Sequence, residues 1–139
     1  MEFLWQIVMV PRMADSNLPY IDLKHIEEIE AIMTEDAGPA VIDFWSPSCG
    51  PCMAMAGDFS QVAEQFDEDE LSFFKVNTMA NGDLAAPFNI RSVPTILFIH
   101  RGKILDAIIG SMPAAKLGAR AEWLLKKSQR KGLFGRFRK

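Results

Sequence analysis

The sequence has little cysteine: only Cys49 and Cys52 among 139 residues, both in one short motif. None is left for a disulfide framework of the kind that stabilises small secreted domains. No apolar run approaches the ~20 residues that span a bilayer. The longest candidate, Phe3–Val10, contains a glutamine, follows a single acidic residue and lacks a signal-peptide cleavage pattern. We therefore expect a cytoplasmic protein in a reducing compartment, or one whose only disulfide is its working part.

Histidine is equally scarce. The two histidines, His25 and His100, fall in unrelated predicted elements. A structural zinc site takes four cysteine or histidine ligands, so the cysteine pair would need two more. The sequence groups no such ligands with it, which argues against a metal site, and nothing in the chain indicates another cofactor.

Charge is distributed unevenly along the chain. The residues after Leu125 include no acid and seven bases, which are Lys126, Lys127, Arg130, Lys131, Arg136, Arg138 and Lys139. Subtracting these seven charges from the net charge of −3 leaves −10 for the preceding residues. Such an acidic body argues against nucleic-acid binding. We expect the basic tail to be solvated and disordered, or to contact an anionic membrane surface or an acidic partner.

The chain length suits one domain, and predicted strands alternate with predicted helices. The expected strands are Pro19–Leu23, Ala40–Trp45, Leu71–Asn77, Pro94–His100 and Ile104–Gly110. The expected helices are Lys24–Met33, Pro51–Phe66, a short one within Gly82–Phe88, and one from Pro113 onward. This order predicts an α/β protein with a mixed central β-sheet flanked by helices on both faces.

The motif CGPC places Cys49 at the expected start of a helix and Cys52 one turn further in. Unpaired N–H groups and the helix dipole favour a thiolate at the first position. Gly50 permits the tight turn, and Pro51 suits the first turn of a helix, where its missing N–H costs nothing. These features favour a redox pair over the alternative of two inert core thiols.

Several segments together resemble the thioredoxin family. They are DFW…CGPC at Asp43–Cys52, FFKVN at Phe73–Asn77, IRSVPT at Ile90–Thr95 and RGK…IIG at Arg101–Gly110. The order of elements agrees from about Leu18 to Lys127. The resemblance implies a thioredoxin fold over residues 18–127, preceded by an extension (1–17) and followed by the basic tail (128–139).

The resemblance also implies roles for four residues. Cys49 would be the attacking nucleophile and Cys52 the resolving thiol. Asp43 would be the buried carboxylate that assists proton transfer at Cys52, with Lys75 as its partner. An aspartate inside an apolar strand is costly unless it is paired or functional, and burial raises its pKa. A purely structural ion pair between Asp43 and Lys75 is the alternative.

Further positions match the family's active-site surroundings. Trp45 matches the tryptophan that packs beside the cysteines, Pro94 the cis-proline, and Val93 a residue whose backbone binds an extended substrate segment. The remaining positions that match the rim of the substrate groove are Ser48, Thr78, Ile109 and Gly110. The sequence departs from the family at Ser48, where a tryptophan is common, and at Met53, where a basic residue is frequent. These differences bear on substrate range and redox potential.

We therefore predict a monomeric thiol–disulfide oxidoreductase that reduces protein disulfides and is itself reduced by a thioredoxin reductase-like enzyme. Two alternatives are open at this stage. One is a binding module of the same fold with a redox-switched cysteine pair. The other is a disulfide donor or isomerase in an oxidising compartment.

Overall fold

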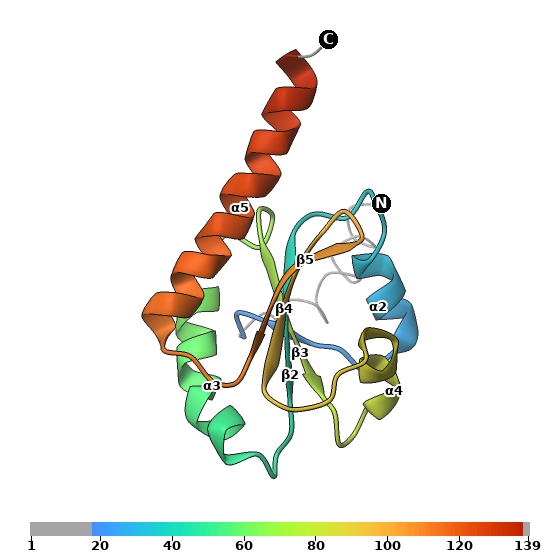
Figure 1. The fold of residues 1–139 in the computed structure, drawn as a ribbon, viewed down its shortest axis with the longest axis vertical. Helices are drawn as coiled ribbons and strands as arrows, with labels where there is room; N and C mark the ends of the chain where they lie inside the picture. Colours follow the sequence, from blue (N-terminus) through green and yellow to red (C-terminus); the bar gives the residue numbers. More distant parts are fainter. Residues whose placement is uncertain (1–17, 138–139) are drawn as a thin grey trace, which may run out of the picture.

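The computed structural model describes residues 18–137. The predicted extension 1–17 and the last two residues of the tail lie outside this range. Within it, five strands and their connecting helices form the mixed α/β architecture predicted from the sequence (Figure 1).

The sheet has the strand order β1-β3-β2-β4-β5. The strands are β1 (Ile21–Asp22), β2 (Ala40–Trp45), β3 (Ser72–Asn77), β4 (Thr95–His100) and β5 (Lys103–Ile109). Strands β1, β3 and β2 are parallel, whereas β4 runs antiparallel to both β2 and β5. The carboxyl ends of the three parallel strands therefore lie at one edge of the sheet, where β2 leads into the CGPC motif.

Alternation along β2 sets which side chains face which helical layer. Val41 belongs to the core beneath α3 (Gly50–Ala63) and α5 (Ala114–Phe137), whereas Ile42 and Phe44 belong to the core beneath the opposite helices. Asp43 lies between Ile42 and Phe44 and therefore faces the same side as Val41. The acidic residue of this strand is thus directed toward the layer that carries the cysteines.

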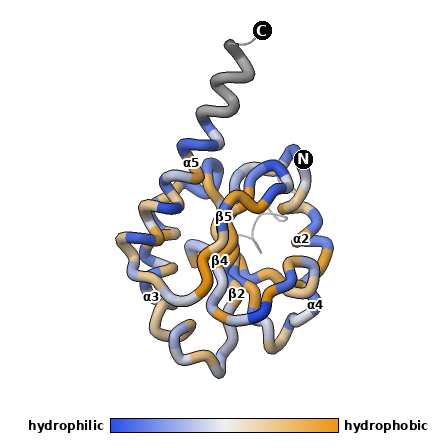
Figure 2. The backbone as a smooth tube through the Cα atoms, in the orientation of Figure 1, coloured by the Kyte–Doolittle hydropathy of each residue, from blue (hydrophilic) through white to orange (hydrophobic). Residues whose placement is uncertain are grey.

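The two helical layers enclose the sheet. On one face α3 and α5 cover a core that includes Phe59, Phe98 and Leu117. On the other, α2 (Ile26–Ile32), α4 (Gly82–Ala85) and the short 3-10 helix η1 (Ala86–Phe88) cover a second core. Figure 1 shows the helices on either side of the sheet, and Figure 2 shows apolar colour concentrated in the central strands. The mixed central sheet with helices on both faces, expected from the sequence, is confirmed.

The β4–β5 hairpin turns through Arg101 and Gly102, both with positive φ (57° and 77°). Paired positive φ values are typical of the two-residue turns that match strand twist. A Cβ on Gly102 would lie 2.6 Å from the Met33 carbonyl oxygen. Position 102 therefore needs glycine for two reasons: its backbone conformation, and its close contact with the backbone at the C-terminal end of α2.

Most elements begin or end one to three residues from their predicted bounds, and only β2 agrees at both ends. Two departures bear on the fold. Strand β1 contains only Ile21 and Asp22, because pairing with β3 covers just Phe74 and Lys75. Helix α5 continues to Phe137, so the expectation of a disordered tail from residue 128 is wrong for residues 128–137. No proline follows Pro113 to interrupt the helix. Figure 1 shows the end of α5 projecting beyond the sheet. The division of the chain at residue 127 stays a prediction.

Candidate active site

The site begins where β2 ends and the chain turns into α3. The Cys49 N–H donates to the Ser46 carbonyl at 3.0 Å, and the Ser48 N–H donates to the Ser46 hydroxyl at 3.2 Å. These bonds close a tight turn that places Cys49 at the N-cap of α3, with Gly50 and Pro51 as its first residues. The turn thus delivers the first cysteine to the helix N-terminus.

Cys49 and Cys52 are joined by a disulfide, with their Cα atoms 5.3 Å apart. Cys49 is half-buried, whereas Cys52 is only 3% exposed. The Cys52 N–H donates to the Cys49 sulfur at 3.2 Å. Because this N–H is one of the orphan donors of the first helical turn, it is placed to stabilise the thiolate that forms at Cys49 when the disulfide is reduced. A partner can reach Cys49 from outside but not Cys52.

The loop before β4 approaches the disulfide from the other side. The Val93–Pro94 peptide is cis, and the Val93 carbonyl oxygen lies 3.6 Å from the Cys49 sulfur. Pro94 is buried, and its carbonyl accepts a hydrogen bond from the Gly110 N–H at 2.8 Å. Gly110 has a φ of +101°, a conformation that favours glycine. The structure therefore brings Val93, Pro94 and Gly110 together beside Cys49.

Asp43 is 1% exposed in the middle of β2. Burial raises its pKa to about 6, an effect only partly opposed by the positive charge of Lys75. Its Oδ1 atom is buried and has no hydrogen-bond partner among the described residues. The direction of this shift is the one expected for a carboxyl group inside an apolar strand.

Lys75 lies beside Asp43 as its register partner on β3, and its side chain is also buried. Within residues 18–137, however, no direct ion pair joins the two side chains. The Lys75 Nζ atom instead lies over three aromatic rings, at 4.9 Å from the Trp45 centroid, 5.0 Å from Tyr20 and 5.8 Å from Phe59. The structural ion pair considered from the sequence is therefore not formed.

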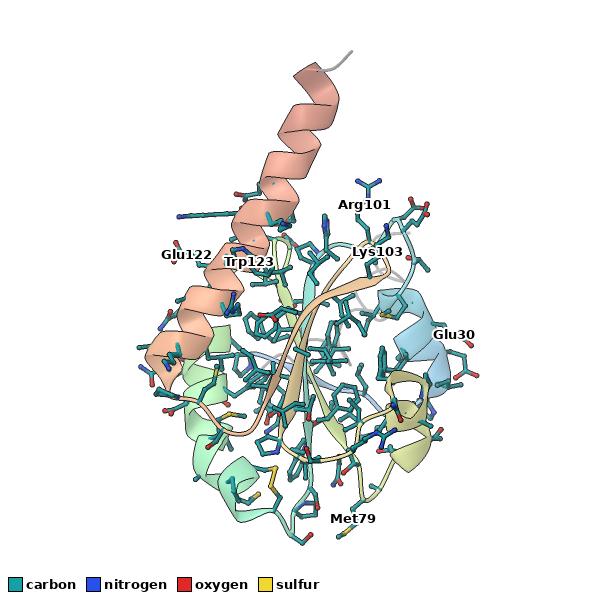
Figure 3. All side chains as sticks on the ribbon, in the orientation of Figure 1. Glu30, Met79, Arg101, Lys103, Glu122 and Trp123 are labelled. Carbon is teal, nitrogen blue, oxygen red and sulfur yellow. A yellow bond between two sulfur atoms is a disulfide. The ribbon has the colours of Figure 1, made fainter. Side chains whose placement is uncertain are left out.

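Exposed apolar side chains lie near the site. Met53 (52% exposed) directly follows Cys52. Met79 (65%) follows the end of β3, and Ile109 (73%) is the last residue of β5. Figure 3 shows Met79 at the end of the molecule that carries the disulfide, opposite Arg101 and Lys103. Such side chains offer adaptable contact area to a partner.

Two predicted rim residues have internal contacts. The Thr78 hydroxyl and N–H both donate to the Trp45 carbonyl, at 3.0 and 2.8 Å, and so join the ends of β3 and β2. The Ser48 hydroxyl is 3.0 Å from that of Ser46, although Ser48 itself is exposed. Thr78 therefore supports the site through the backbone beside it, and Ser48 stabilises the turn.

Sequence reasoning missed Tyr20 and Phe59 as neighbours of the buried charges. The sequence predicts Phe59 only as part of a helix and Tyr20 only as part of a strand. The available signal was alternation: Tyr20 is two residues from Asp22, the register partner of Lys75, and thus shares its face of the sheet. Using that signal required the β1–β3 register, which the sequence does not contain.

Comparison with known proteins agrees with this geometry. The family model described as Thioredoxin matches residues 23–122. A thioredoxin from Griffithsia pacifica is 38% identical over 57% of this chain and 72% of its own length. A chloroplastic M-type thioredoxin from Pisum sativum is 36% identical over 60% of this chain and 48% of its own length.

The fold comparison gives the same family. A crystal structure of the Malassezia sympodialis thioredoxin superposes with a TM-score of 0.69 and 26% identity, covering 76% of this chain and 90% of that one. Fold, cysteine pair and sequence together define a thiol–disulfide oxidoreductase of the protein-disulfide reductase type. The chain belongs to the thioredoxin family.

No group of three or more His, Cys, Asp or Glu side chains within residues 18–137 is placed to hold a metal ion. No helix in that range is both long and apolar enough to cross a membrane.

Proposed function

We propose that Cys49 is the nucleophile that attacks disulfides in protein substrates and that Cys52 resolves the product. The Cys49 thiolate attacks one substrate sulfur, the substrate S–S bond breaks, and the other substrate sulfur leaves as a thiolate that takes a proton. The Cys52 thiolate then attacks the Cys49 sulfur and releases the second substrate thiol. The substrate gains two electrons and two protons, and Cys49 and Cys52 become a disulfide. The difference in exposure between the two cysteines carries this assignment.

Asp43 accepts the proton of Cys52 in the second step. A pKa of about 6 leaves the carboxylate mostly ionised at neutral pH yet basic enough to bind a proton. Burial of both Asp43 and Cys52 keeps bulk water from taking over this transfer. Lys75 moderates the basicity of the carboxylate through its charge.

The substrate segment binds in extended form along the Val93 backbone, beside Cys49. The packing residues that hold this surface are Trp45, Gly50, Pro51 and Pro94. Its rim is formed by Ser48, Thr78, Ile109 and Gly110. The exposed apolar side chains of Met53, Met79 and Ile109 support substrates that present apolar side chains around the disulfide.

We further propose a cytoplasmic monomer that is recycled by a thioredoxin reductase-like enzyme. The two cysteines of the chain form one working pair, which fits a reducing compartment. The basic end of the chain contacts an anionic membrane surface or an acidic partner. Its seven cations, with no acid among them, support this proposal. Sedimentation with anionic vesicles at low and physiological salt tests the first of these contacts, because screening weakens a purely electrostatic one.

The order of attack is tested with Cys52→Ser and Cys49→Ser variants incubated with a disulfide-bonded protein such as insulin. We expect Cys52→Ser to accumulate a mixed disulfide through Cys49, resolved by mass spectrometry, and Cys49→Ser to accumulate none. Adducts on Cys52 in the Cys49→Ser variant, or none in either variant, would refute the assignment. Asp43→Asn is expected to slow the second step at least about tenfold while leaving adduct formation intact.

A further inference from the structure

The positive charge of Lys75 is buried among aromatic side chains. A buried ammonium is costly unless another group compensates its desolvation. Asp43 is the nearest buried charge by register, yet among the described residues the two form no direct ion pair. Three rings surround Nζ instead, and attraction to the faces of aromatic rings is a recognised way to stabilise a desolvated cation.

The three rings come from different parts of the fold. Trp45 ends β2 beside the cysteine turn, and Phe59 is fully buried in the middle of α3. Tyr20 directly precedes β1 at the sheet edge and is half-buried. Its ring packs edge-on against Phe59, with centroids 6.1 Å apart. Tyr20 therefore completes the group of three rings around Nζ from the edge of the sheet.

Tyr20 is also in electrostatic contact with the acids of this region. Burial raises its pKa, and the charges of Asp22 and Asp43 raise it further. The phenol thus stays neutral in the neutral pH range and contributes its ring, not a charge. From the other packed elements, β4 places the apolar Ile96 opposite Asp43, and α3 contributes the Phe59 ring with the disulfide at its N-terminus.

We propose that Tyr20 is a positioning residue for the proton-transfer pair: its ring holds the Lys75 ammonium away from a direct ion pair with Asp43. If the ring is removed, Lys75 is free to approach the carboxylate, and a closer cation favours the ionised form. The ring therefore keeps the carboxyl group able to bind a proton near neutral pH. This inference rests on the proposed role of Asp43, but the contact itself is independent of turnover.

The test is the titration of the Asp43 carboxyl carbon by ¹³C NMR in the full-length disulfide form, which needs no catalysis. The variants are Tyr20→Leu, which removes the ring, and Tyr20→Phe, which keeps it. We expect the midpoint in Tyr20→Leu to fall by roughly half a pH unit or more, and that in Tyr20→Phe to remain at the wild-type value. Tyr20→Met, which has a similar length but no ring, serves if Tyr20→Leu does not fold.

Two controls separate positioning from packing. Phe74→Leu removes an aromatic ring from the same sheet edge but on the opposite face, where Phe74 packs against the α2 core. It should leave the midpoint unchanged. In a Lys75→Met background, Tyr20→Leu should shift nothing, because the effect runs through Lys75.

An unchanged midpoint in Tyr20→Leu overturns the proposal, as does an equal shift in Tyr20→Phe or Phe74→Leu. A shift that persists in the Lys75→Met background also overturns it, because the ring would then act by excluding water. The proposed catalytic role of Asp43 is tested separately. If Asp43→Asn resolves the mixed disulfide at the wild-type rate, Asp43 has no part in turnover. That result would remove the catalytic meaning of the contact without changing the titration.

Discussion

The Cys52 N–H donates a hydrogen bond to the Cys49 sulfur at 3.2 Å, so in the reduced protein the backbone of one cysteine is placed to stabilise a thiolate on the other. This relationship makes the two cysteines unequal although only two residues separate them. Cys49 is the N-cap residue of α3 and is half-buried, whereas Cys52 is buried.

Alkylation of the reduced protein is expected to modify Cys49 well before Cys52. The thiolate is the reactive form, and the helix N-terminus favours it at Cys49. Brief treatment with iodoacetamide at neutral pH, followed by peptide mass spectrometry, measures the order. Equal labelling, or faster labelling of Cys52, would contradict the geometry.

Asp43→Asn is expected to increase stability above pH 6. The pKa of Asp43 in the folded protein, about 6, lies above the ordinary aspartate value of 3.8, so the folded protein binds the proton more tightly. The contribution of protonated Asp43 to the free energy of unfolding is therefore fully present below about pH 4 and is lost as the pH rises through about 6. A shift of this size corresponds to about 3 kcal/mol.

Urea unfolding of wild type and Asp43→Asn at pH 4 and pH 7.5 checks this prediction. The useful quantity is the difference between the two proteins at each pH, because other carboxylates titrate equally in both. The stability of the variant relative to wild type should rise by up to about 3 kcal/mol between these pH values. A constant difference would contradict the raised pKa.

Ile109→Ser is expected to lower kcat/KM for a protein disulfide several-fold and to leave reduction of a small aromatic disulfide unchanged. Ile109 is 73% exposed beside the segment that carries Pro94, so its apolar contact would be made only with a large partner. Ile104→Ser is the matched control, since Ile104 is exposed near the other end of the same strand. Equal losses in both variants, or a loss with the small disulfide, would argue against a substrate-binding rim.

Gly102→Ala is expected to destabilise the fold by about 1–3 kcal/mol. The new Cβ would meet the Met33 carbonyl at 2.6 Å, in a backbone conformation that alanine rarely adopts. Gly57→Ala is the control: Gly57 lies inside α3 with open space around its Cβ, so alanine should stabilise by up to about 1 kcal/mol. Thermal unfolding of both variants measures the two effects, and a neutral Gly102→Ala would contradict the close contact.

Much of the fold was predictable from local patterns. The apolar run Ala40–Trp45 is the strand β2 to the residue, because a strand buried on both faces has few alternatives. Pro51 correctly indicated the start of α3, since proline suits only the first turn of a helix. The resemblance carried by CGPC and IRSVPT led to the correct family.

Other features depended on contacts between distant residues. The shortness of β1 follows from how much of β3 it pairs with, and its own five-residue pattern does not contain that information. The helical continuation after Lys127 has no distinctive periodicity of its own and follows from propagation of α5 in the absence of a proline.

The sequence by itself determined the reactive motif, the order of elements and the burial of an acid in β2, because each depends on neighbouring residues. Only the tertiary structure decided how the buried charges are arranged. The family resemblance predicts Asp43 and Lys75 as partners, and the pairing of β2 with β3 does place them side by side. Whether they pair depends on what else surrounds the ammonium. Tyr20, Trp45 and Phe59 come from three separate elements, and only folding brings their rings within 6 Å of Nζ.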